Sequence, residues 1–202
     1  MHVTITHLIF DLSEVLIRGL VGIDDALGEL LGIKSDRLLH KFGGNDLRAL
    51  CKNDITEDEY LKNIITKEKW NCSLKELKKI IRNNFHIVIG TMDEVIAKLS
   101  EKYTLILLSD HAQEWIEYIE EHHEFLNYFS VRIFSFETGH MKYEINNFQK
   151  LLTDLNISSD SCLFIDDRMV SIDAANMCGI RGIIFKDQDQ LIGELREFGV
   201  VI

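Results

Sequence analysis

Leu8-Ile-Phe-Asp-Leu-Ser-Glu-Val-Leu-Ile17 places an aspartate, Asp11, directly after a near-continuous apolar run that begins at Val3. Such a run is typical of a strand covered on both faces, as in a parallel sheet. In open parallel sheets, ligands bind at the carboxyl ends of the strands. Asp11 therefore stands where the sequence predicts a binding or catalytic site.

Four more apolar runs of this kind follow, and stretches with helical periodicity lie between the later ones. Alternation of strand and helix is the pattern of βαβ units, so it predicts a Rossmann-like α/β core with a parallel sheet. The predicted strands are Val3–Phe10, Tyr103–Leu108, Val131–Phe134, Cys162–Ile165 and Gly182–Phe185, and the predicted helices are Asp93–Glu101, Gln113–Glu121, Asn146–Leu155 and Ser171–Cys178.

The connection after the first strand is much longer than a crossover requires, and its patterns are helical. Thr56, followed by acidic residues, indicates a helix N-cap, and Ser73 with Glu76 forms a possible capping box. We therefore expect residues 17–87 to form an inserted helical cap, and residues 1–16 and 88–202 to form the α/β core.

Polar residues follow four of the predicted elements. Asp11 follows the first strand, Ser109 and Asp110 the second, Lys142 comes after the third, and Asp166 and Asp167 follow the fourth. Each alone reads equally well as a cap, turn or surface residue. Because the carboxyl ends of parallel strands meet at one edge, we expect these side chains to converge.

The order and spacing of these polar residues resemble the four motifs of the haloacid dehalogenase-like (HAD) superfamily. The resemblance runs from about Val3 to Phe185. The matching segments are residues 8–17, residues 107–109, residues 139–142 and residues 164–168, the last followed by Ala174-Ala175 and Gly179. The long insert lies where the family carries a helical cap. The Asp-Asp-Arg form of the last motif is similar to members that include sugar-phosphate phosphatases.

The resemblance implies a role for each of these residues. Asp11 would be the nucleophile that forms an aspartyl-phosphate. Ser109 and the backbone N–H of Asp110 would bind phosphate oxygens, and Lys142 would neutralise the developing charge. The substrate would be a small phosphorylated metabolite, with a sugar phosphate as one candidate.

The resemblance also implies a magnesium site. Asp11, the backbone carbonyl of Ser13, and Asp166 would bind Mg²⁺, with Asp167 acting directly or through water. Mg²⁺ prefers hard oxygen ligands and keeps several waters, which leaves room for a phosphate oxygen. A cation held by Asp11 and Asp166 would support this metal assignment, whereas a lysine ion pair that fills the space between them would overturn it.

Ser13 departs from the family pattern, because phosphatases of the family usually carry an acid/base aspartate at this position. General acid–base help is typically worth ~10²–10⁴-fold. Its loss predicts slow turnover or a need for good leaving groups, unless Glu14 turns inward and supplies the proton. Two alternatives stay open: a haloacid dehalogenase, and a non-catalytic binding or regulatory protein on the same fold.

Bulk properties limit the partners. The net charge of -11 argues against nonspecific binding to nucleic acid or to an anionic membrane. The four cysteines form no close pair, so reduced thiols are the simple interpretation. The apolar run before Asp11 is too short to span a membrane and lacks a signal-peptide pattern, so we expect a cytoplasmic protein.

A few other residues are weaker candidates. Arg48, Lys52 and His40 lie in the predicted cap and could reach the distal part of a substrate, although a solvated helix face explains them as well. His111 and His140 each lie beside a predicted motif. The two tryptophans, Trp70 and Trp115, are most simply packing residues.

Overall fold

The computed structural model describes residues 4–202, and its core is a five-stranded sheet. The strand order is β3-β2-β1-β4-β5, and every neighbouring pair is parallel. The predicted α/β fold with a parallel sheet is thus confirmed. The strands are β1 (His7–Phe10), β2 (Thr104–Ser109), β3 (Val131–Phe134), β4 (Cys162–Asp166) and β5 (Arg181–Ile184).

The strand bounds match the sequence prediction within one residue, except in β1. This strand begins at His7 rather than Val3, which lies outside the described residues. The preceding chain still runs beside the sheet, since the Thr6 N–H donates to the Ser161 carbonyl at 3.0 Å. Residues 4–6 nevertheless fall outside the strand.

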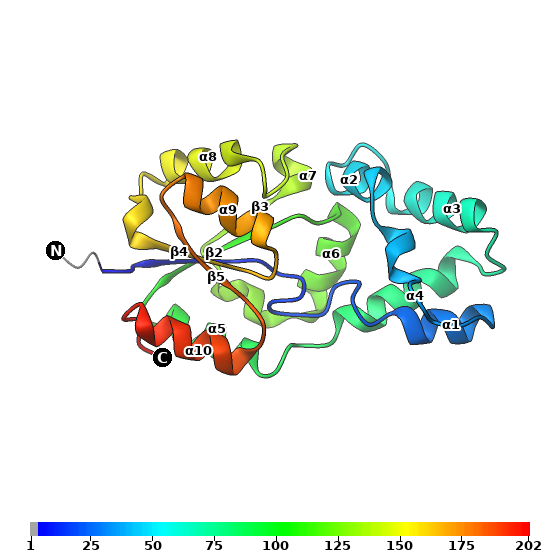
Figure 1. Ribbon diagram of the computed structural model, residues 1–202, viewed down its shortest axis with the longest axis horizontal. Helices are drawn as coiled ribbons and strands as arrows, with labels where there is room; N and C mark the ends of the chain where they lie inside the picture. The colour runs from blue at the N-terminus through cyan, green and yellow to red at the C-terminus, as the bar shows by residue number, and fades with distance from the viewer. Residues whose placement is uncertain (1–3) are drawn as a thin grey trace.

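Helices cover both faces of the sheet (Figure 1). Leu8, Leu105 and Leu163 pack in one core cluster with side chains of α5, α6 and α10, whereas Ile9 and Phe164 pack in a second with α8 and α9. The helical elements of the core are α5 (Met92–Ser100), α6 (Gln113–His122), η2 (Glu124–Tyr128), α7 (Ser135–Thr138), α8 (Ile145–Leu155), η3 (Ser159–Ser161), α9 (Met169–Met177) and α10 (Gln188–Glu197). The sequence prediction did not include α10.

A second, helical lobe is formed by the chain between β1 and α5 (Figure 1). Thr56 is the N-cap of α3 and Ser73 forms a capping box with Glu76 at α4, as the sequence indicated, and Thr56 also forms a capping box with Glu59. The Gly43-Gly44 pair separates η1 from α2. The elements are α1 (Asp24–Leu31), η1 (Leu39–Phe42), α2 (Asn45–Cys51), α3 (Glu57–Glu68) and α4 (Leu74–Phe85).

The two chain segments that join the lobes run side by side. Ile17 pairs with Val88 in an antiparallel bridge, and the Arg18 N–H donates to the Ile87 carbonyl at 2.8 Å. The first core cluster continues from the sheet into the helical lobe. We therefore propose, as the sequence suggested, that residues 17–87 are an inserted cap packed on the core.

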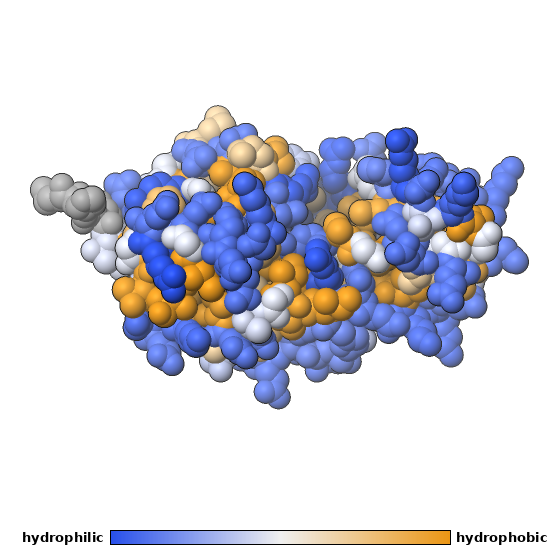
Figure 2. Space-filling view, turned by 60° about the horizontal axis from the view of Figure 1, so that its bottom comes forward, coloured by the Kyte–Doolittle hydropathy of each residue, from blue (hydrophilic) through white to orange (hydrophobic). Residues whose placement is uncertain are grey.

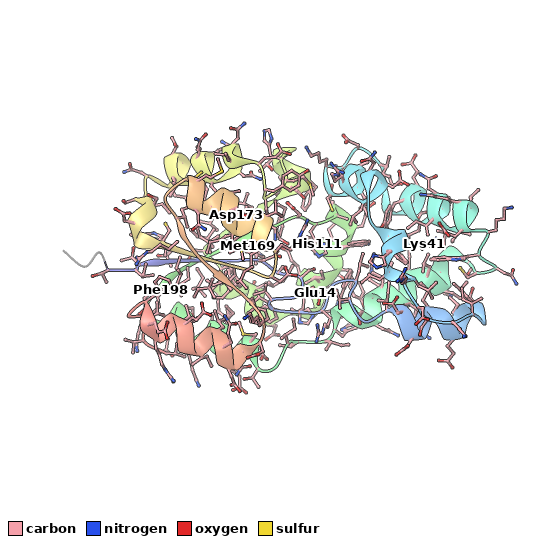
Figure 3. The ribbon with its side chains drawn as sticks, viewed as in Figure 1. Glu14, Lys41, His111, Met169, Asp173 and Phe198 are labelled. Carbon is pink, nitrogen blue, oxygen red and sulfur yellow. The ribbon has the colours of Figure 1, made fainter. Side chains whose placement is uncertain are left out.

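The surface is hollowed between the two lobes, with polar and charged side chains around the apolar patches (Figure 2). His111 and Glu14 lie where the lobes meet (Figure 3). In residues 4–202 no helix is long and apolar enough to cross a membrane. All four cysteines are free thiols.

Candidate active site

Asp11 is held at the end of β1 by backbone and side-chain hydrogen bonds. Its N–H donates to the Ile165 carbonyl at 2.9 Å, which fixes it against β4. Its Oδ1 accepts from the Leu12 N–H at 2.7 Å and from the Ser109 hydroxyl at 3.0 Å. The residue is 4% exposed, so its carboxyl group lies at the floor of the site in a fixed orientation.

Register explains why Asp166 meets Asp11. Phe10 is level with Ile165 in the β1–β4 pair, so the next residue of each strand reaches the same height. Phe10 is also level with Leu107 of β2, and Ser109 follows two residues later. The sequence-predicted convergence of these strand ends is present in the structure.

Lys142 joins two of the acids. Its Nζ lies 2.5 Å from Asp11 Oδ2 and 2.7 Å from Asp166 Oδ2, and the residue is 2% exposed. Burial acts against the ammonium ion, but attraction from Asp11, Asp166 and Asp110 is stronger and raises the pKa of Lys142. The lysine is therefore charged and fixed beside the candidate nucleophile.

Lys142 forms the ion pair between Asp11 and Asp166 that the sequence prediction set against a metal there, so a metal would have to bind beside this lysine or displace it. Lys142 contacts the Oδ2 atom of each carboxylate. One carboxylate oxygen from each of Asp11, Asp166 and Asp167 lies within 4.8 Å of the other two. One ammonium group faces three carboxylates there, so the donor set fits a hard divalent cation. The ligand set, including the Ser13 carbonyl, remains a prediction.

The two acids after β4 have raised pKa values. Burial raises the pKa of Asp166, and attraction to Lys142 offsets only part of the shift. Burial of the carboxyl group and then repulsion from Asp11 raise the pKa of Asp167 to about 6. Asp166 is buried and Asp167 is exposed, and crowded carboxylates with raised pKa values are characteristic of functional sites.

Asp110 shapes the loop that carries Lys142. Its Oδ1 accepts from the Lys142 N–H at 2.8 Å, whereas its buried Oδ2 has no partner among the described residues. Burial raises the pKa of Asp110. Its side chain thus ties the second motif to the third, in addition to the role that the sequence predicted for its backbone N–H.

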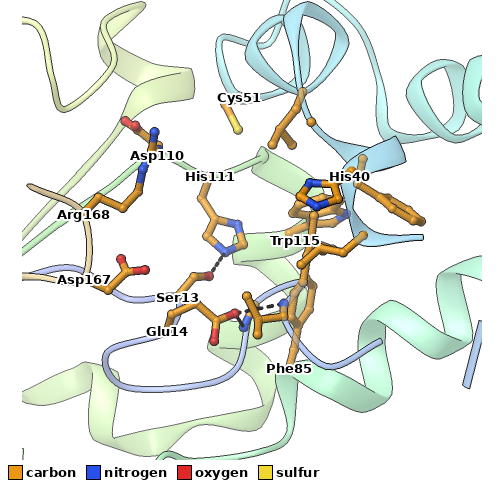
Figure 4. Close-up of a pocket in the computed structure, with 17 residues that line it drawn as sticks. Ser13, Glu14, His40, Cys51, Phe85, Asp110, His111, Trp115, Asp167 and Arg168 are labelled. Atoms are coloured by element: carbon orange, nitrogen blue, oxygen red, sulfur yellow. Dashed lines mark hydrogen bonds between the residues drawn. The ribbon is translucent and has the colours of Figure 1, made fainter. Parts of the chain in front are cut away.

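Ser13 and His111 form a hydrogen bond across the site. Ser13 Oγ and His111 Nε2 are 3.1 Å apart, and His111 is 3% exposed (Figure 4). Burial lowers the pKa of His111 to about 4, so its ring is neutral near pH 7. His111 is therefore more than the ordinary loop residue that the sequence also allowed.

Glu14 does not turn inward as a free acid. Its backbone adopts a positive φ of 63°. Its Oε1 accepts from the N–H groups of Gly19 and Val21, and its Oε2 pairs with Arg18 at 3.1 Å. Glu14 thus organises the connection to the helical lobe. It does not take over the role of the acid/base aspartate that the family usually carries at position 13.

The helical-lobe candidates have different environments. His40 and Arg48 line cavities between the lobes. Lys52 pairs with Glu144 of the core at 3.0 Å, and Glu144 also bonds His140 at 2.8 Å. Lys52 and His140 therefore belong to an ion-pair cluster that joins the lobes.

Several residues that shape the site were not predicted from the sequence. Glu57 is 1% exposed and accepts from Trp115 Nε1 at 2.6 Å and from Arg82 at 2.8 Å. Ser135 accepts from the His111 N–H and donates to the Cys51 carbonyl. Glu57 looks like an ordinary first-turn acid in the sequence, so no local signal marks it. Trp115, predicted as a packing residue, also lines the cavity between the lobes that His40 lines.

The site has a buried aspartate at the end of the first strand, a serine and two acids from the ends of neighbouring strands, and a lysine from the loop between α7 and α8. This arrangement defines the class of HAD-fold hydrolases. A family model described as haloacid dehalogenase-like hydrolase matches residues 8–185. The chain belongs to this family. The resemblance that the sequence motifs suggested is thereby confirmed at the family level.

Individual relatives agree with this assignment. Flavin mononucleotide hydrolase 1 of Arabidopsis thaliana chloroplasts is 24% identical over 170 residues, which cover 79% of this chain and 69% of that protein. A HAD family enzyme of Bacteroides thetaiotaomicron, crystallised with magnesium and inorganic phosphate, superposes with a TM-score of 0.71 at 21% identity, covering 93% of this chain and 98% of that one. A dehalogenase superposes with the same TM-score at 12% identity, covering 88% of this chain and 83% of that one. The fold alone therefore does not separate phosphatase from dehalogenase.

Proposed function

We propose that this hydrolase is a Mg²⁺-dependent phosphatase that cleaves a small phosphorylated metabolite through an aspartyl-phosphate on Asp11. The observation that carries this proposal is the group of three carboxylates whose oxygens lie within 4.8 Å. A dehalogenase needs no metal, and it would leave Asp166 and Asp167 as an unexplained cluster of negative charge, offset only in part by Lys142, beside an anionic substrate. A phosphatase uses them as ligands.

In the first step, an Asp11 carboxylate oxygen attacks phosphorus and the bond from phosphorus to the ester oxygen breaks. The departing alkoxide takes a proton from water. In the second step, water attacks phosphorus and the bond from phosphorus to the Asp11 oxygen breaks, which releases inorganic phosphate and restores the carboxylate. The proton lost by this water neutralises the hydroxide left by the first step. Lys142 and Ser109 hold Asp11 in place and lie where phosphate oxygens would bind. A bound Mg²⁺ would reduce repulsion between nucleophile and substrate.

Proton transfer is the weak point of this site. Ser13 does not titrate near neutral pH, and Glu14 is committed to the Gly19 and Val21 N–H groups. We therefore propose slow turnover, or a preference for esters whose leaving group departs without a proton. Replacing Ser13 by Asp should raise the rate on simple alkyl phosphates.

The substrate and location are further proposals. The form of the last motif favours a sugar phosphate, whereas the similar Arabidopsis protein is named for flavin mononucleotide. Both compounds belong in the substrate panel. A cytoplasmic location also stays a proposal, because that relative is a chloroplast protein.

The test is phosphate release from sugar, nucleotide, flavin and acyl phosphates, with Mg²⁺ or with a chelator, using Asp11→Asn as the control. Metal-dependent release that disappears in Asp11→Asn is the expected result. Release from no substrate, even with Ser13→Asp, would contradict the proposal. A 2-haloacid panel run in parallel would then decide for the dehalogenase or for a binding protein.

A further inference from the structure

A cavity of about 360 Å³ lies between the lobes, beside the candidate active site (Figure 4). This volume lies at the lower end of the range for small-molecule sites. Apolar side chains form much of its wall. They are Leu20, Val21, Leu39, Phe42, Leu47, Phe85 and Trp115.

The two sides of the cavity differ in chemistry. Asp110, Asp167 and Arg168 lie on one side of His111, and Trp115 and Phe85 lie on the other (Figure 4). The first side adjoins the carboxylates, where a phosphoryl group would sit. The second side is where the rest of the substrate would lie, and it is mostly apolar and aromatic.

Most polar atoms near the apolar side are already paired, and the exception at His111 is its buried Nδ1 atom, which has no partner among the described residues. The Trp115 indole N–H donates to Glu57 at 2.6 Å. Glu14 accepts from two backbone N–H groups, and His111 Nε2 bonds Ser13. Among the lining residues of this side, the His40 ring and the Cys51 thiol remain.

A sugar would therefore bury hydroxyl groups against this wall with too few partners. Each buried hydroxyl without a hydrogen bond costs roughly tenfold or more in affinity. A flat aromatic ring has no such cost, and it would contact Trp115 and Phe85 favourably. The wall thus discriminates between the two classes of leaving group.

We propose that the substrate is a phosphate ester of an alcohol that carries a flat aromatic or heteroaromatic ring, and that free sugar phosphates are poor substrates. This inference rests on the proposed function, because it names the ester that Asp11 would cleave. The recognition element is the wall formed by Val21, Leu39, Phe85 and Trp115.

The test compares two esters of primary alcohols, 2-phenylethyl phosphate and glucose 6-phosphate, so that leaving-group basicity is nearly matched. We expect kcat/KM to favour the aromatic ester by about tenfold or more. In Val21→Ser this ratio should fall severalfold. The Val21 side chain is partly exposed, while its backbone N–H bonds Glu14 and its carbonyl accepts from Asn84, so the fold should tolerate the change.

Ile33→Ser is the matched control, because Ile33 is an exposed apolar residue of the same lobe outside this cavity. It should leave the ratio unchanged. Equal or better cleavage of glucose 6-phosphate, or a ratio that Val21→Ser does not alter, would overturn the inference while the phosphatase stands.

A binding measurement covers the case in which neither ester is cleaved. The indole N–H signal of Trp115, assigned by NMR with Trp70→Phe, should shift on adding 2-phenylethanol and not on adding glucose. A shift without any catalysis would contradict the proposed phosphatase and support the binding of an aromatic ring at the cavity wall. An unresponsive Trp115 signal would overturn the inference.

Discussion

Lys142→Met is the substitution whose effect the structure specifies most closely. Methionine keeps much of the volume and removes the ammonium group that lies 2.5 Å from Asp11 and 2.7 Å from Asp166. Oxygens of these two buried carboxylates lie within 4.8 Å. At that separation, and with an effective dielectric constant of about 20, their repulsion is about 3.5 kcal/mol.

We therefore expect Lys142→Met to lower the free energy of unfolding by about 3–5 kcal/mol at pH 9, which lies above the pKa of about 7 to which burial raises Asp166; this is the usual result of breaking a buried ion pair. Urea denaturation followed by circular dichroism, in the presence of a chelator, measures the change. Lys150→Met is the matched control. Lys150 pairs with Asp154 at 2.6 Å, but their side chains are 63% and 54% exposed, so about 0.5 kcal/mol or less is expected.

Two further dependences test the same reasoning. Lowering the pH should reduce the defect of Lys142→Met, because burial raises the pKa of Asp166 and its protonation removes the repulsion. Adding Mg²⁺ should also restore stability, by about 2.7 kcal/mol at a hundred times its Kd. If Lys142→Met is no less stable than Lys150→Met, the electrostatic argument is wrong. If Mg²⁺ changes unfolding in neither the wild type nor Lys142→Met, the metal site is refuted.

Three other substitutions probe the junction of the lobes and the missing acid. Glu57→Gln should lower stability by roughly 1–3 kcal/mol in urea unfolding, because it removes a buried charge partner while the Trp115 bond can persist. Glu144→Gln should be destabilising above pH 4.5, and the difference should shrink toward pH 2, because the hydrogen bond from His140 lowers the Glu144 pKa from 4.5 to about 2. A pH-independent difference would refute that assignment. Ser13→Asp should raise kcat on alkyl phosphates by ~10²-fold or more, and an unchanged rate would show that proton transfer does not limit turnover.

The parallel sheet and the meeting of the motifs were predictable because both follow from short-range patterns. Apolar runs of strand length marked the five strands, and the rule for parallel strands placed their polar ends together. Asp11, Ser109, Lys142 and Asp166 are accordingly in contact. Helix α10 could also have been predicted from the sequence, because Asp187 is an N-cap residue. Its side chain accepts a hydrogen bond from the Gln190 N–H at 2.9 Å.

The cavity wall was not predictable in the same way. Phe42, Phe85 and Trp115 come from three separate elements, and in sequence each has the pattern of a core aromatic. Whether a buried ring faces other side chains or a cavity depends on how the lobes dock. The positive φ of Glu14, which directs its carboxylate to backbone N–H groups, has no signal in the side-chain type.

Docking of the lobes links stability to selectivity in this chain. Asp11, Ser109 and Lys142 would contact only the phosphoryl group, which every candidate ester shares, so they cannot discriminate between leaving groups. If the proposed substrate class is right, discrimination arises at the wall, where Glu57 accepts a hydrogen bond from Trp115 across the junction. A variant that loosens this junction should therefore change the ratio of kcat/KM between esters more than it changes the cleavage of a minimal phosphate.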